Sequence, residues 1–155
     1  MNQQQITEIQ IREAQEQDLA GVLRLYQHLL PEEDFSAIEQ FRNTWKTLLQ
    51  AGDIHKILVA DTADDLAATC VLSILPNLTR GQRPYALIEN VVTDPVYRRK
   101  GYGRALLQNA IERAHRRNCY KVMLLSSTDR IHAHEFYKSL GFDAESKTGF
   151  QLRLP

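Results

Sequence analysis

The chain has 155 residues, a length typical of a single domain, and we expect one domain over residues 1–155. Its 19 basic and 19 acidic residues give a net charge of zero, which disfavours a dedicated nucleic-acid binder. The composition, 43% hydrophobic and 25% charged, excludes a mainly disordered chain. The chain has only two cysteines, which predicts a reduced protein without a metal site. It shows no signal-peptide pattern and no apolar run of membrane-spanning length, which predicts a cytoplasmic location.

The first half of the chain predicts a strand, two helices and a hairpin. Residues 9–12 alternate between apolar and polar side chains, as on a half-buried strand. Apolar residues at helical spacing predict helices over 19–30 and 36–52, and the second begins with a capping-box pattern. The period then changes, and residues 54–60 and 66–75 are expected to form two hairpin strands.

The second half alternates strands with helices. A β-branched run at 85–93 is followed by a basic glycine-containing turn at 98–104 that begins a helix. A short buried strand at 121–125, a helix around 133–140 and a final strand candidate at 150–154 complete the chain. The order β-α-α-β-β-β-α-β-α, then one or two strands, predicts a mixed α/β sheet, antiparallel in the middle and with βαβ character around the turn.

The glycine turn is the most informative segment. Gly101 and Gly103 allow backbone N–H groups to converge at the N-terminus of the following helix, where the helix dipole also favours an anion such as a pyrophosphate. Basic residues surround the turn: Arg98, Arg99, Lys100 and Arg104. A dinucleotide fingerprint requires glycine where Leu106 stands, and a Walker A loop requires Gly-Lys followed by Ser or Thr, so neither fits. An ordinary strand-to-helix turn is the alternative at this point.

This region resembles motif A of the GNAT acyl-CoA N-acyltransferases. That family has an Arg/Gln-x-x-Gly-x-Gly/Ala turn, matched here by Arg98–Gly103, with Val91–Pro95 before it and Ala105–Leu107 after it. Downstream, Phe136–Phe142 is similar to the family's Phe-Tyr-x-x-x-Gly-Phe segment. The element order matches over nearly the whole chain. The resemblance implies a GNAT fold and transfer of an acetyl group from acetyl-CoA to a primary amine by direct attack.

A narrower resemblance concerns the glucosamine-phosphate N-acetyltransferases of this family. It is carried by Ile88–Val92 and Asn118–Lys121. Those enzymes usually have Glu-Asp where this chain has Glu89-Asn90, and other small-amine enzymes of the family share the Glu-Asn form. Arg130 stands where family members often place an asparagine that contacts the cofactor, so the contacts of that loop are not carried over.

The resemblance also implies where acetyl-CoA binds. The turn amides would hold the pyrophosphate, and the backbone of residues 91–93 would pair with the pantetheine arm like an added strand. An N–H near Val91 would face the thioester oxygen. The expected cofactor-binding residues are Val91, Val92, Thr93, Arg98, Arg99, Lys100, Gly101, Tyr102, Gly103 and Arg104.

Two side chains are candidates for proton transfer. Glu89 lies in an apolar strand and is the candidate base, directly or through a water, and its alternatives are an ion-pair partner or a solvent-facing charge. Tyr137 is the candidate acid, because a phenol of pKa about 10 can protonate a thiolate whose acid has a pKa of about 8.5. Its alternative is a packing residue beside Phe136.

The expected substrate is a small-molecule amine, held against the first two helices and the 76–84 loop. No nucleic-acid or membrane partner is expected, and a homodimer is allowed for. Two other functions remain open: a catalytically idle acyl-CoA-binding or regulatory module, and an acetyltransferase that acts on a protein or peptide amine.

Overall fold

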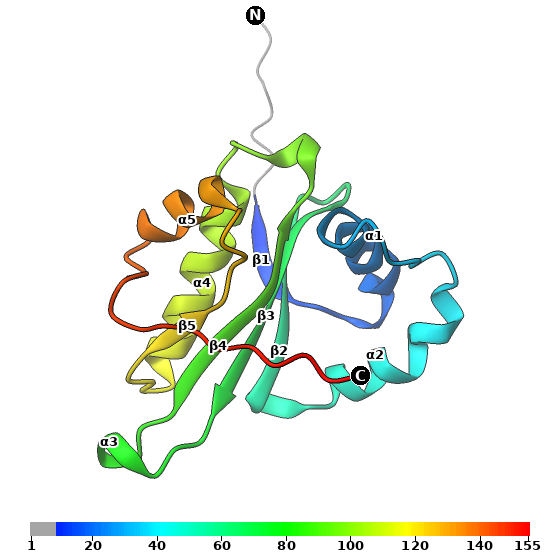
Figure 1. Cartoon of the computed structure of the whole chain (residues 1–155). Coiled ribbons are helices and arrows are strands. Elements are labelled where there is room, and N and C mark those ends of the chain that lie inside the picture. The colour runs from blue at the N-terminus through cyan, green and yellow to red at the C-terminus, as the bar shows by residue number, and fades with distance from the viewer. Residues whose placement is uncertain (1–8) are drawn as a thin grey trace, which may run out of the picture.

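The computed structural model describes residues 9–155, with a five-stranded sheet at its centre (Figure 1). The strands lie side by side in chain order: β1 (Gln10–Glu13), β2 (His55–Asp61), β3 (Leu66–Leu75), β4 (Tyr85–Thr93) and β5 (Val122–Leu124). The first four are antiparallel, and β4 and β5 are parallel. The predicted mixed α/β sheet is therefore confirmed.

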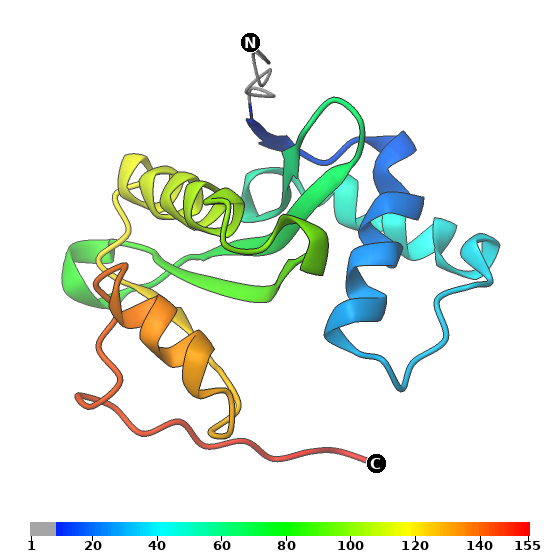
Figure 2. The same cartoon turned by 90° about the horizontal axis from the view of Figure 1, so that it is seen from above.

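Helices cover both faces of the sheet (Figures 1 and 2). The α1 (Leu19–Leu29) and α2 (Arg42–Leu49) helices lie on one face, and α4 (Tyr102–Arg116) and α5 (Ile131–Lys138) lie on the other. The short elements are α3 (Thr79–Gln82) and the 3-10 turns η1 (Glu16–Asp18), η2 (Ile38–Phe41), η3 (Gly52–Ile54) and η4 (Pro95–Tyr97). Within residues 9–155, none of the helices combines the length and apolar character that crossing a membrane requires.

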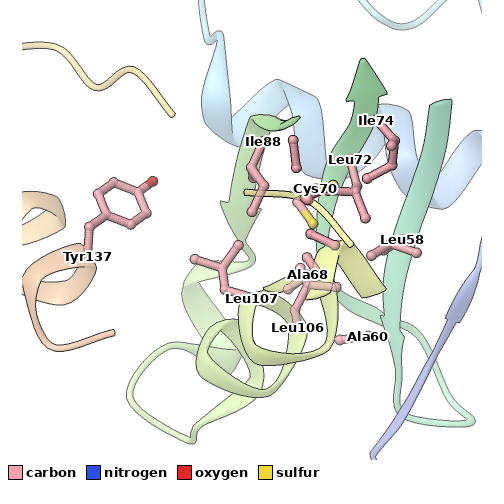
Figure 3. Close-up of a cluster of buried hydrophobic side chains, with 14 of the residues drawn as sticks. Leu58, Ala60, Ala68, Cys70, Leu72, Ile74, Ile88, Leu106, Leu107 and Tyr137 are labelled. Atoms are coloured by element: carbon pink, nitrogen blue, oxygen red, sulfur yellow. The ribbon is translucent and has the colours of Figure 1, made fainter. Parts of the chain in front are cut away.

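Two hydrophobic cores follow from this layering. On the α4/α5 face the core includes Leu58, Cys70, Leu72, Ile88 and Leu106 (Figure 3). On the α1/α2 face the core includes Val22, Leu25, Trp45, Val59 and Val71. Neighbouring residues of one strand, such as Leu58 and Val59, enter opposite cores because side chains alternate along a strand. A sheet covered on both faces explains the nearly continuous apolar sequence of β3.

The expected final strand at 150–154 is wrong. No strand is assigned in residues 143–155, and the side chains of Phe150, Leu152 and Leu154 are 92%, 85% and 82% exposed. Figure 2 shows this C-terminal tail running apart from the sheet. Alternating apolar residues make a segment suitable for a strand, but a strand also needs a hydrogen-bonded partner, and the tail has none among residues 9–155.

The predicted capping box at the second helix also does not form. The Ser36 N–H donates to Asp34 Oδ1 at 2.8 Å, and Glu39 pairs with Arg42 at 2.7 Å instead of reaching back to Ser36. The helical conformation begins as η2, and α2 follows it. Asp34 makes an Asx-type turn here, which takes the backbone donor that the capping box would have used.

Candidate active site

The β4 strand contains a bulge at Asn90. Glu89 pairs with Val71 and Val92 pairs with Thr69, so two residues of β4 lie opposite the single residue Cys70. Asn90 has a left-handed φ of 51°. The extra residue reverses the alternation of side chains: Ile88 packs in the α4/α5 core, whereas Val92, four residues later, packs in the α1/α2 core.

Beside this bulge β4 separates from β5. The parallel pairing runs from Ala86 opposite Val122 to Ile88 opposite Leu124 and then ends. From Glu89 onwards, the edge of β4 that faces β5 has no strand partner within residues 9–155. Backbone groups on this open edge are available to a ligand, and they lie at the carboxyl end of a parallel strand pair, where α/β sheets commonly bind ligands.

Glu89 lies on the α1/α2 face and is exposed, not buried. Its register partner, Val71, belongs to the core on that face. No Arg or Lys of the described residues lies within ion-pair distance of its carboxylate. The ion-pair alternative for Glu89 therefore has no support among the described residues, and the exposed carboxyl group lies beside the open edge.

Tyr26 of α1 approaches the same bulge, a contact that the sequence did not indicate. Burial raises the pKa of Tyr26, and the adjacent Asn90 side chain partly offsets this rise. The centroid of the Tyr26 ring lies 6.2 Å from that of Phe35, and the Phe35 centroid lies 5.7 Å from that of Phe41. These three rings therefore form a series of aromatic contacts that begins with Tyr26, next to the bulge, on the α1/α2 face.

The 76–84 loop does not join this site. It lies at the far end of the β3–β4 hairpin, where α3 marks its position in Figure 1. Arg83 donates to the carbonyl oxygens of Asn118 and Cys119, at 3.2 and 3.1 Å, and the Arg80 guanidinium lies over the Tyr120 ring. The expectation that this loop helps to hold the substrate is therefore not supported.

Tyr137 reaches the sheet from the opposite face. Its ring is 8% exposed and packs with Phe136 and Phe142, at centroid distances of 5.6 and 6.1 Å. In Figure 3 the hydroxyl points away from α5, toward the side on which Ile88 lies. Burial raises the pKa of Tyr137, Arg130 opposes this, and the Cys70 thiol adds to it. Cys70 lies opposite the bulge, so the Tyr137 hydroxyl is directed to the level at which β4 opens.

The glycine turn presents free backbone donors. Gly101 is left-handed, with a φ of 88°, and α4 begins at the next residue. The first helical hydrogen bond runs from the Ala105 N–H to the Gly101 oxygen, so the N–H groups of Tyr102, Gly103 and Arg104 have no intrahelical acceptor. A Cβ atom added at Gly103 would lie 2.8 Å from Thr93 Oγ1, so the turn fits closely against the end of β4.

The basic residues of the turn differ in their surroundings. Arg98 donates from Nε to the Thr93 oxygen at 3.2 Å, and Arg104 donates to Ser139 Oγ at 2.6 Å. The Lys100 ammonium lies 5.6 Å from the centre of the Tyr97 ring. Arg99 is exposed. The Tyr102 ring packs against the Tyr97 ring, with centroids 5.4 Å apart, and Tyr102 is partly buried.

Comparison with known proteins identifies the family. Residues 14–142 match the model of the acetyltransferase (GNAT) family. The chain is a member of the GNAT acetyltransferase family. It is 34% identical over 149 residues to a glucosamine 6-phosphate N-acetyltransferase of Trypanosoma brucei brucei, covering 96% of this chain and 97% of that protein. A rice glucosamine 6-phosphate N-acetyltransferase is 31% identical, covering 79% of this chain and 73% of that one.

Comparison with solved structures agrees with this family assignment. A solved structure of an Agrobacterium tumefaciens protein named as a candidate acetyltransferase is 43% identical and superposes with a TM-score of 0.89, covering 94% of this chain and 99% of that one. As a GNAT member, the protein is an acetyl-CoA-dependent N-acetyltransferase. The residues present fit acetyl-CoA, because an open strand edge and free helix N-terminal donors lie next to each other.

Proposed function

We propose that the protein acetylates a primary amine of a small molecule, with the amine attacking from the Glu89 side of the β4 bulge. The observation that carries this proposal is the bulge itself. It places Glu89 beside an unpaired strand edge while Tyr137 approaches the same level from the other face. Support for a small acceptor comes from the T. brucei relative, whose named substrate is an amino-sugar phosphate.

In this proposal acetyl-CoA binds along β4 and then the turn. The backbone of Val91, Val92 and Thr93 pairs with the pantetheine arm, and an N–H near Val91 faces the thioester oxygen. The N–H groups at the start of α4 hold the pyrophosphate, and Arg98, Arg99, Lys100 and Arg104 supply positive charge around it. When bound, acetyl-CoA supplies the acetyl group as a thioester.

Glu89 and Tyr137 would divide the proton transfers. Glu89, directly or through a water, removes the proton that the amine loses as its nitrogen bonds to the acetyl carbon. Tyr137 gives its proton to the sulfur as the carbon–sulfur bond breaks. An ordinary phenol is already protonated at neutral pH, and burial raises the pKa of Tyr137 further. The two side chains lie on opposite faces of the sheet, so acid and base do not exchange their proton directly.

The acceptor class is tested by thiol release from acetyl-CoA with a panel of amines. The panel contains glucosamine 6-phosphate, glucosamine, a polyamine, an amino acid and a peptide with a free N-terminus. We expect turnover with at least one small amine and none with the peptide. Turnover with the peptide alone, or CoA binding without turnover on any amine, would overturn the proposal in favour of a peptide acetyltransferase or an idle binding module.

We also propose that the protein forms a homodimer through its C-terminal tail. The tail alternates apolar and polar residues from Phe150 to Leu154, and its apolar side chains are almost fully exposed. Leu125, directly after β5, is also 69% exposed. A second copy carries the same tail and the same β5 edge, so each chain could pair its tail with the sheet of the other.

A further inference from the structure

An ion pair connects α1 to the segment that leads from β4 into the glycine turn. Asp94 directly follows β4, and its side chain is only 9% exposed. One carboxylate oxygen accepts the Val96 N–H at 2.9 Å, and the other accepts Nη1 of Arg24 from α1. His28 of the same helix lies 3.7 Å from this second oxygen. Both oxygens of Asp94 therefore have partners, one on its own loop and one on a helix.

Arg24 also binds the start of β3. Its Nη2 donates to Asp65 Oδ1 at 2.7 Å and to the Leu66 oxygen at 2.8 Å. The Asp94 N–H, in turn, donates to the Ala67 oxygen at 2.9 Å. One guanidinium thus links α1, the first residues of β3 and the end of β4, a task suited to the planar fork of donors that arginine carries and lysine lacks.

Close packing fixes α1 at the same place. A Cβ atom on Gly21, one helical turn before Arg24, would lie 2.9 Å from Leu66 Cδ1. The helix therefore rests directly on the residue whose carbonyl Arg24 binds. Since α1 and the start of β3 are held together in two ways, the position of the Arg24 guanidinium is well defined, and it can act as a fixed point for Asp94.

Asp94 lies between the two parts of the proposed cofactor site. Residues 91–93 precede it, and the turn at 98–104 follows after the single 3-10 turn η4. A rotation at Asp94 would change the orientation of the turn donors relative to the strand edge. A partly exposed ion pair such as Arg24–Asp94 adds little stability on average. Its position therefore points to a role in orienting the strand edge and the turn.

We propose that Arg24 and Asp94 are positioning residues that hold the β4 edge and the glycine turn in the one relative orientation in which acetyl-CoA can bind to both. The proposal rests on the proposed cofactor placement. Substitution of Gly103 tests that placement separately. A failure of the cofactor placement can therefore be distinguished from a failure of the positioning role of Arg24 and Asp94. Arg24 and Asp94 touch neither acetyl-CoA nor the amine in this proposal, and they act through the residues on each side of Asp94.

The test compares two acetyl donors. Acetyl-CoA would contact both the strand and the turn, whereas acetylpantetheine lacks the nucleotide and its phosphates and would contact only the strand. Asp94→Asn removes the charge but keeps an oxygen for the Val96 N–H. We expect Asp94→Asn and Arg24→Gln each to lower kcat/KM for acetyl-CoA roughly tenfold, mainly through KM, and to change kcat/KM for acetylpantetheine by less than about twofold. The double variant should lose no more than the worse single variant, because both remove one interaction.

Asp65→Asn is the matched control. It removes the charge of the other carboxylate that pairs with Arg24 but leaves the Leu66 and Asp94 contacts of Arg24 in place, so kcat/KM for acetyl-CoA should fall clearly less than with Asp94→Asn. Arg24→Lys, which keeps the charge, should recover part of the loss caused by Arg24→Gln. Equal losses with both donors, an Asp65→Asn effect as large as that of Asp94→Asn, or a lowered Tm with unchanged kinetics would overturn the proposal. If Arg24→Gln does not fold, Asp94→Asn and Arg24→Lys still decide the question.

Discussion

Glu89 lies in an apolar stretch of sequence, and the structure exposes its side chain on the α1/α2 face, as the solvent-facing alternative predicted. A base that accepts a proton from an incoming amine needs access from outside, so exposure fits the proposed role. The feature of Glu89 that supports its proposed role is its position next to the bulge.

Replacement of this carboxylate gives the first prediction. Glu89→Gln keeps the shape of the side chain and removes its basicity, so kcat should fall about 10²-fold near neutral pH while the affinity for CoA is retained. The measurement is a pH–rate profile together with calorimetric CoA binding. Glu112→Gln on α4 is a suitable control. A profile identical to that of the unmodified protein would make Glu89 an ordinary surface charge.

The packing of Tyr137 is compatible with its proposed role as the acid. Its ring belongs to the α4/α5 core, as the packing alternative required, and its hydroxyl has no hydrogen-bond partner among residues 9–155. Tyr137→Phe should therefore leave Tm and CoA affinity almost unchanged and lower kcat by roughly 10²–10⁴-fold. The loss should be smaller with an acetyl donor whose thiol has a lower pKa, because that leaving group needs less protonation.

The pH dependence follows from the direction of the Tyr137 shift. Burial raises the pKa of this phenol, so the proton is present below the raised value and is lost only as the pH rises through it. Activity that depends on Tyr137 should thus persist at neutral and mildly alkaline pH and decline above that range. Tyr137→Phe should lack this alkaline decline, which the same pH–rate profile measures, and a decline unchanged in the variant would assign it to another group.

At the scale of elements, the junction between β4 and α4 carries the next prediction. Gly103→Val would bring a branched side chain against Thr93 Oγ1, which lies 2.8 Å from where its Cβ would be, and Phe136 Cζ lies 3.8 Å away. The turn must shift from the strand, so we expect CoA affinity to fall by about tenfold or more while far-UV circular dichroism stays unchanged. Gly52→Ala, at a left-handed glycine with open space around it, controls for a general effect of glycine replacement on folding. Unchanged CoA affinity in a folded Gly103→Val protein would show that CoA does not bind at this turn.

The exposed C-terminal tail leads to a prediction about the oligomeric state of the protein. Removal of residues 148–155 should convert the proposed dimer to a monomer, because it deletes the exposed residues Phe150, Leu152 and Leu154. Light scattering after size-exclusion chromatography measures this. Leu78→Ser, which removes a 90% exposed leucine far from the tail, should leave the dimer intact. A full-length chain that is monomeric at all concentrations tested would contradict the dimer.

Most of the elements and the family could be predicted from short stretches of sequence. Periodicity located the β2–β3 hairpin, β4 and α1 to within about one residue, because these signals depend on neighbours close in the chain. The glycine turn and the Phe136–Phe142 segment identified the GNAT family for the same reason: each motif is contiguous. Signals of this kind also suggested one strand, at 150–154, and one capping box, at Ser36, that did not form. The strand has no partner among residues 9–155, and the Ser36 N–H is bonded to Asp34.

How these elements come together in a candidate site could not be predicted from the sequence, because it depends on long-range contacts. The bulge at Asn90 changes which face each later side chain of β4 occupies, and it is defined by the register with β3, about 20 residues away in the chain. The contact between Arg24 and Asp94 joins residues 70 positions apart. Such contacts depend on how helices and strands pack, and local sequence carries no periodic signal for them. The proposed base, the proposed acid and the proposed cofactor turn therefore acquire their relation to one another only when β4 separates from β5 between the two helical layers.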